Sequence, residues 1–136
     1  MNKVTINKDI TVFCVKAKSF PAGIPEAHDT LRSLIPFDPA RKFYGISAPD
    51  KSGAIIYRAA AEELREGELA KHKLEAFTIK RGVYIYSDVK EYKRNAMLIT
   101  NAFKELLSNP KIDPDGYCLE RYINDTDCRC MVKINV

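Results

Sequence analysis

The sequence contains no tryptophan, only two histidines and no long apolar run. No stretch approaches the roughly 20 apolar residues that a membrane-spanning helix requires. Residues 1–9 are polar and do not contain the apolar core of a signal peptide. We therefore expect a cytoplasmic protein that has no membrane partner.

A cluster of basic residues is also missing from the sequence. The formal net charge is +4, and the 22 Lys and Arg residues are scattered among 18 Asp and Glu residues. Binding of duplex DNA requires basic side chains gathered along one face. The residues before the first expected strand leave no room for a helix-turn-helix. We therefore expect no direct nucleic-acid binding.

The cysteines do not follow a spacing typical of a metal site. They are Cys14, Cys118, Cys128 and Cys130. The last two form a Cys-x-Cys pair, whereas zinc sites more often use Cys-x-x-Cys, commonly twice or with histidines. Both histidines, His28 and His72, lie far away in the sequence. We expect free thiols and neither a metal nor a cofactor.

What the chain does contain is typical of one globular domain. It has 136 residues, of which 46% are hydrophobic and 29% are charged. A chain of this length buries enough surface to fold without disulfides or metal ions. We therefore expect a single domain that spans residues 1–136.

Apolar periodicity predicts two helices and a set of strands. Ile24, Ala27 and Leu31 recur at helical spacing and predict a helix over residues 25–35. A stripe formed by Tyr92, Ala96, Ile99, Phe103 and Leu106 predicts a second helix over residues 90–107. The expected strands cover residues 10–20, 42–47, 54–61, 74–89 with an interruption at Gly82, 117–123 and 128–136. Residues 62–73 are expected to form a connection.

The expected elements follow the order strand–helix–strand–strand twice, over about residues 10–62 and 74–136. This order favours an α+β fold built from a duplicated β-α-β-β unit. Its strands would form an antiparallel sheet with two helices packed on one face. The other face of the sheet would remain free for a ligand cleft.

Strand alternation suggests which side chains occupy that free face. Cys118, Glu120 and Tyr122 share one face of their strand, and the opposite, more apolar face suits packing under a helix. We therefore place Glu120 on the free face, where a carboxylate among tyrosines suits an organic cation. In the alternative, Glu120 faces solvent and pairs with Arg129 or Lys133 on the neighbouring strand.

Three segments together carry a resemblance to a known family. They are Tyr44-Gly45-Ile46, the run from Phe77 to Tyr84, and Cys118-Leu119-Glu120-Arg121-Tyr122. Their order and spacing resemble the GyrI-like small-molecule-binding family, which includes the effector-binding domains of multidrug-responsive and AraC-type bacterial transcription regulators. Members of that family often carry a tryptophan in the second helix, which this chain lacks.

The resemblance implies a ligand cleft between the two halves of the fold, with Glu120 as the acidic anchor. The aromatic walls would be Tyr44, Tyr84 and Tyr122, together with Tyr57 and Phe77. We therefore expect a stand-alone effector-binding or sequestering protein for a lipophilic organic molecule, cations included. We assign it no catalytic residue.

Two alternative functions remain open. Some relatives that the chain resembles hydrolyse reactive small molecules, and in such an enzyme Glu120 would serve as general base with Tyr84 or Tyr122 as hydrogen-bond donor. In a protein-binding module of the gyrase-inhibitor type, the sheet edge or residues 62–68 would meet a protein partner. His28 and His72 are expected on the surface in every case.

Overall fold

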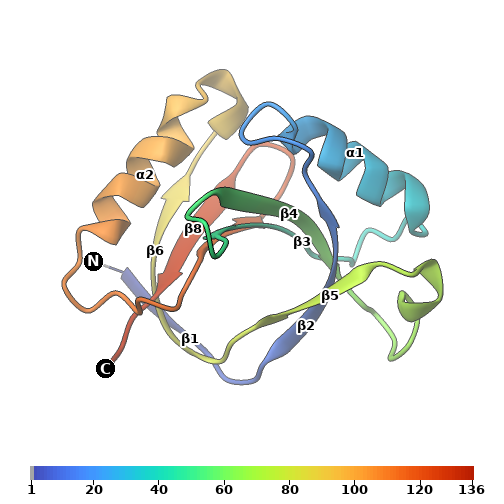
Figure 1. Ribbon diagram of the computed structural model, residues 1–136, viewed down its shortest axis with the longest axis horizontal. Helices are drawn as coiled ribbons and strands as arrows, with labels where there is room; N and C mark the ends of the chain where they lie inside the picture. The colour runs from blue at the N-terminus through green and yellow to red at the C-terminus, as the bar shows by residue number, and fades with distance from the viewer. Residues whose placement is uncertain (1) are drawn as a thin grey trace.

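One antiparallel sheet organises residues 2–136, the part of the chain that the computed structural model describes (Figure 1). The strand order is β1-β6-β8-β7-β3-β4-β2-β5, so that β7 and β3 pair at the centre. The strands are β1 (Asn2–Ile6), β2 (Ile10–Lys16), β3 (Phe43–Pro49), β4 (Ile55–Glu62), β5 (Glu75–Ile79), β6 (Gly82–Val89), β7 (Cys118–Tyr122) and β8 (Cys128–Lys133). The helices are α1 (Ile24–Leu34), α2 (Met97–Leu107) and the short 3-10 helices η1 (Ala70–His72) and η2 (Tyr92–Arg94).

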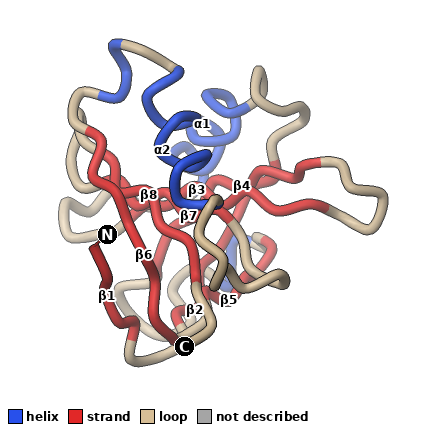
Figure 2. Tube along the Cα trace, turned by 90° about the vertical axis from the view of Figure 1, so that its left-hand side faces the viewer, coloured by secondary structure: helices blue, strands red, loops and turns tan. Residues whose placement is uncertain are grey.

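The sheet curls into an open half-barrel, and both α-helices lie on its outer side (Figures 1 and 2). Helix α1 packs on β4 and β2, while α2 packs on β8 and β6. The central strands β7 and β3 therefore lie between the two helices. No helix of residues 2–136 is long and apolar enough to span a bilayer.

Side-chain alternation buries both faces of this sheet. Outside the curl, one core gathers around Leu31 of α1 and a second around Phe103 and Leu106 of α2. Inside the curl, a third core contains residues of seven strands and no residue of either α-helix, with Ile46 and Leu119 near its centre. Burial on both faces means that apolar character alone does not tell one face from the other.

The α+β fold with an antiparallel sheet and two helices is confirmed, and the first helix and most strands lie within a few residues of their expected positions. Each half of the chain contains strand–helix–strand–strand, as β2-α1-β3-β4 and β6-α2-β7-β8. Whether these halves, over about residues 10–62 and 74–136, are a duplicated unit stays a prediction. So does the single domain over residues 1–136.

The second helix begins later than predicted, at Met97 instead of residue 90. Backbone N–H groups of Glu91 and Tyr92 donate to Asp127 and Thr126, which ties this segment to the β7–β8 loop. Glu91 also adopts a left-handed conformation with φ 50°, and this interrupts a helix. The side chain of Asn95 then accepts the backbone N–H of Met97 and starts α2.

Strand β1 was missed, and β2 is shorter than the predicted strand over residues 10–20. Val4 and Ile6 alternate with polar residues in β1 and pack against the core inside the curl. Two apolar side chains in a polar segment are too weak a signal to predict a strand. Pairing with β6 supplies the missing stabilisation.

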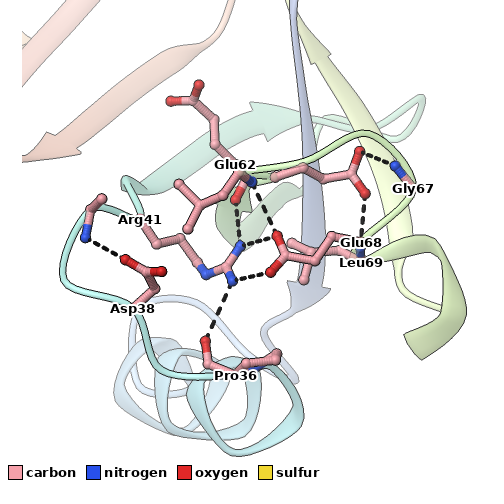
Figure 3. Close-up of polar contacts among 10 residues, drawn as sticks. Pro36, Asp38, Arg41, Glu62, Gly67, Glu68 and Leu69 are labelled. Carbon is pink, nitrogen blue, oxygen red and sulfur yellow. Dashed lines mark hydrogen bonds and ion pairs between the residues drawn. The ribbon is translucent and has the colours of Figure 1, made fainter.

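A buried arginine fastens the connection between β4 and β5 (Figure 3). The Arg41 guanidinium donates to both carboxylate oxygens of Glu68, at 2.9 and 2.8 Å, and to the carbonyl of Glu62 at 3.0 Å. This bidentate hydrogen bonding holds the pKa of Glu68 down at about 2. Leu69, in the same connection, is completely buried against the core beneath α1.

Arg41→Ala is expected to lower the midpoint of urea unfolding, because Glu68 and the Glu62 carbonyl lose their donor. The matched control is Arg94→Ala, which removes an exposed arginine that pairs with Glu91. Exposed ion pairs contribute little, so the control should leave the midpoint almost unchanged. Equal midpoints for the two variants would show that Arg41 does not hold the connection in place.

Candidate functional site

The strip of sheet between the two helices carries a buried carboxylate. We call the helix-facing residues of β3 and β7 the central strip: Phe43, Gly45, Ser47, Cys118, Glu120 and Tyr122. Phe43 packs with the core beneath α1, and Cys118 and Tyr122 pack with the core beneath α2. Gly45 stands directly opposite Glu120 in the pairing of β3 with β7.

The predicted face of Glu120 is therefore wrong. Its strand face points toward the helices, whereas Leu119 belongs to the core inside the curl. The prediction assumed that the more apolar face of this strand lies beneath a helix. The inside of the curl is itself an apolar core, so Leu119 is buried there just as well.

The structure divides the predicted ligand-binding residues between the two faces. Glu120, Tyr122 and Tyr57 lie on the helix side, where Tyr122 and Tyr57 bond to each other. The other three, Tyr44, Tyr84 and Phe77, belong to the core inside the curl. The two tyrosine hydroxyls already form hydrogen bonds there: that of Tyr44 donates to Glu62, and that of Tyr84 donates to the carbonyl of Lys80.

The alternative pairing of Glu120 with a neighbouring basic residue is also wrong. Arg129 forms a bidentate ion pair with Asp88, and Lys133 pairs with Asp113. Within residues 2–136, the ion pairs of the structure do not include Glu120. This carboxylate is thus buried without a cationic partner.

A chain of hydrogen bonds ends at Glu120. His28 Nε2 lies 2.8 Å from the Tyr57 hydroxyl, which lies 2.9 Å from the Tyr122 hydroxyl. Tyr122 in turn donates to Glu120 Oε1 at 2.6 Å. With the proton of His28 on Nε2, every group in the chain donates to the next, and the carboxylate accepts the last hydrogen bond.

His28, Tyr57 and Tyr122 also belong to a group of aromatic side chains that we call the aromatic cover. Its members are Phe20, His28, Tyr57, Tyr92 and Tyr122. His28 meets Tyr57 and Tyr122 edge-on, with ring centroids 5.8 and 5.2 Å apart. Phe20 stacks on Tyr57 at 6.3 Å, and Tyr92 is tilted against Tyr122 at 5.7 Å. Phe20 is 47% exposed, so the aromatic cover reaches the protein surface.

His28 was expected on the surface, and this expectation is wrong. Its side chain is half-buried and bonds to both tyrosine hydroxyls of the site. A usable signal was present in the sequence, because His28 follows Ile24 by four residues and precedes Leu31 by three. That spacing places it on the apolar face of α1, which packs on the sheet.

Gly45 leaves the space that the tyrosine hydroxyls occupy. A Cβ atom at this position would lie 2.1 Å from the Tyr57 hydroxyl oxygen and 3.0 Å from that of Tyr122. The bare backbone of β3 thus lets both hydroxyls converge beside Glu120. The Tyr44-Gly45-Ile46 segment therefore has a steric reason for its glycine.

Burial determines the protonation of the site. Glu120 is only 7% exposed, and burial raises its pKa above the ordinary value, against the opposing effect of the hydrogen bond from Tyr122. Burial and the nearby Arg32 lower the pKa of His28 to about 4, so the imidazole is neutral at neutral pH. A positive charge placed near Glu120 would favour its ionised form.

Three of the four free cysteines line the sheet around Glu120. Cys130 stands opposite Glu120 and Cys128 opposite Tyr122, while Cys118 precedes Glu120 by two residues. Burial raises the pKa of Cys118 to about 11, so it is a neutral thiol at neutral pH. Within residues 2–136, no group of three or more His, Cys, Asp or Glu residues is arranged to hold a metal ion.

Two hollows in the surface lie away from Glu120. One, of about 320 Å³, is lined by residues 9–11 and 62–66. The other, of about 330 Å³, lies between the β1–β6 edge and α2, near Tyr86 and Glu105. Glu120 is only 7% exposed and lines neither hollow, so a molecule reaches this carboxylate only if side chains around it move.

Solved structures from bacteria share this fold. An integron cassette protein from Vibrio cholerae superposes with a TM-score of 0.67 at 14% identity, covering 98% of this chain and 95% of its own. SAV2435, solved bound to tetraphenylphosphonium, gives 0.66 at 11% identity, covering 98% and 93%. A hydrolase from Listeria innocua gives 0.61 at 10% identity, covering 98% and 90%.

A fourth neighbour is described as a bacterial transcription regulation protein from Staphylococcus aureus, with a TM-score of 0.60 at 12% identity and 97% coverage of both chains. No known family model and no curated protein match the sequence. At these low identities the likenesses establish the fold, which the four proteins share with this chain over nearly its whole length.

Gly45→Ala is expected to lower the free energy of unfolding by about 1–3 kcal/mol, because the new methyl group overpacks the site. In the double variant Gly45→Ala/Tyr57→Phe, loss of the hydroxyl removes the shortest contact and should recover part of that loss. Urea unfolding of the two single variants and the double variant measures this coupling. Simple additivity would contradict the described position of the Tyr57 hydroxyl.

Proposed function

We propose that this protein binds a lipophilic organic cation, with Glu120 as the anchor beneath the aromatic cover. The observation that carries the proposal is the burial of Glu120 without a cationic partner among residues 2–136. A buried charge is costly unless it is paired. A cationic ligand would supply the missing charge from outside the chain.

The rings around Glu120 suit the apolar part of such a ligand. Tyrosine faces attract organic cations, and the attraction grows when the site excludes water. We propose that Tyr57 and Tyr122 contact the ligand, with Phe20 and Tyr92 at the entrance. Tyr44, Tyr84 and Phe77 then support the sheet from inside the curl.

The comparisons support this proposal through their descriptions. SAV2435 was solved with a lipophilic cation, and another neighbour is described as a transcription regulation protein. Both agree with the GyrI-like resemblance of the three sequence segments. We propose a stand-alone effector-binding or sequestering role, without direct contact to nucleic acid, in which a protein partner could respond to the bound ligand.

The hydrolase alternative has one specific observation in its favour, the neighbour from Listeria innocua. In this function Glu120, with its raised pKa, would take a proton from water and Tyr122 would donate a hydrogen bond to the substrate. Glu120 and Tyr122 would then act on a bound substrate, and that substrate would be a reactive electrophile.

Tetraphenylphosphonium is expected to raise the Tm of the wild-type protein by several degrees, since a ligand at 100 times its Kd stabilises the folded state by about 2.7 kcal/mol. Glu120→Gln keeps the side-chain shape but removes the charge and should abolish the shift. The matched control is Glu62→Gln, which removes a carboxylate that faces Tyr44 inside the curl. Equal shifts in all three proteins would refute Glu120 as the anchor.

Affinity should also fall as the pH is lowered through the raised pKa of Glu120, because the protonated carboxyl has no charge to offer the cation. An epoxide included in the same screen tests the alternative. Its consumption by the wild-type protein and not by Glu120→Gln would replace binding with hydrolysis as the function. If the protein unfolds cooperatively and no compound raises its Tm, the protein-binding module remains as the function to be tested.

A further inference from the structure

The His28 imidazole is a planar heteroaromatic ring already seated among the residues of the proposed ligand site. It meets two tyrosine rings edge-on, at interplanar angles of 67° and 86°. Its Nε2 atom lies 2.8 Å from the Tyr57 hydroxyl and 3.3 Å from that of Tyr122. These contacts belong to a side chain from α1, whereas the tyrosines belong to β4 and β7.

We propose that the His28 ring is an internal occupant of the site, and that the ligand presents a planar nitrogen-heteroaromatic cation which takes the place of this ring against Tyr57 and Tyr122. This inference rests on the proposed function and narrows the ligand to pyridinium-like and imidazolium-like compounds. It also makes His28 the residue that sets how tightly such compounds bind.

The neutral imidazole satisfies the tyrosines but not Glu120. It contributes edge-to-face ring contacts, which a flat heteroaromatic ring of similar size can also make, and one hydrogen bond to Tyr57. It supplies no positive charge to the carboxylate at the end of the hydrogen-bond chain. A heteroaromatic cation of similar size makes the same ring contacts and adds that charge, so the exchange favours the ligand.

The position of His28 allows this exchange without unfolding the sheet. The side chain is half-buried at the edge of the central strip, and its neighbour Phe20 is 47% exposed. A change of rotamer carries the imidazole toward solvent while Ala27 and Leu31 remain packed beneath α1. A ligand must compete with the His28 ring for the site. Its apparent affinity is therefore its intrinsic affinity multiplied by the fraction of time that His28 leaves the site open.

The presence of only two histidines makes a direct test possible in the wild-type protein. The ring signals of His28 and His72 are followed by NMR during titration with N-butylpyridinium. His28 signals should move to positions typical of an exposed histidine as the ring leaves the two tyrosines. His72, in η1, is the internal control and should stay in place.

Two matched comparisons complete the experiment. Butyltrimethylammonium, a cation without a ring, should bind at least about tenfold more weakly than N-butylpyridinium. His28→Ala should raise the affinity for N-butylpyridinium by about tenfold or more, because the internal competitor is gone. His28→Phe keeps a ring in place and should not gain affinity, which separates displacement from a general loosening of α1.

The outcomes distinguish this inference from the proposed function. If tetraphenylphosphonium binds and N-butylpyridinium saturates the protein while the His28 signals do not move, the displacement is refuted and the cation site stands. If butyltrimethylammonium binds as tightly as N-butylpyridinium, the preference for a heteroaromatic cation is refuted. If no cation, tetraphenylphosphonium included, binds to the wild-type protein or to His28→Ala, the proposed function fails and this inference fails with it.

Discussion

The carboxyl group of Glu120 is buried at the centre of the sheet, and the features around it follow from the cost of burying it. Gly45 on the opposite strand leaves room for two tyrosine hydroxyls: that of Tyr122 donates a hydrogen bond to the carboxylate, and that of Tyr57 bonds to Tyr122. The arginine and lysine on the neighbouring strand β8 are paired elsewhere. Hydrogen bonds alone do not offset desolvation, so the pKa of Glu120 stays raised.

A raised carboxyl pKa in the folded state has a consequence for stability. The contribution of this group is fully present below its unfolded-state pKa and is lost as the pH rises through the folded-state pKa. At neutral pH the site therefore costs stability that the rest of the fold must offset. The Arg41–Glu68 ion pair, which lies away from the site, and the three apolar cores supply such compensation. A buried carboxyl group whose raised pKa costs folding stability at neutral pH is typical of a functional site.

The sequence predicted the elements better than their faces. Periodicity located α1, because this signal is local. It misplaced the start of α2, since Glu91 and Tyr92 are held by hydrogen bonds to the β7–β8 loop, which no local pattern reveals. It named Glu120, Tyr57 and Tyr122 in one site together with Tyr44, Tyr84 and Phe77, which lie on the other face. It assigned the face of Glu120 and Tyr122 incorrectly, because the curl of the sheet buries both faces. The burial of His28 could be predicted from its place on the apolar face of α1, but its hydrogen-bond partners could not, because they lie 29 and 94 residues away along the chain.

The central claim is that Glu120 is a buried carboxyl group which gains its charge partner from a ligand. The most direct measurement is the pKa of Glu120 itself, followed through the ¹³C chemical shift of its side-chain carboxyl carbon in the free protein and in the complex with tetraphenylphosphonium. The account predicts a titration midpoint above the ordinary value of 4.5 in the free protein and a lower midpoint in the complex. A midpoint at or below 4.5 in the free protein, or one that the bound cation leaves unchanged, would contradict it.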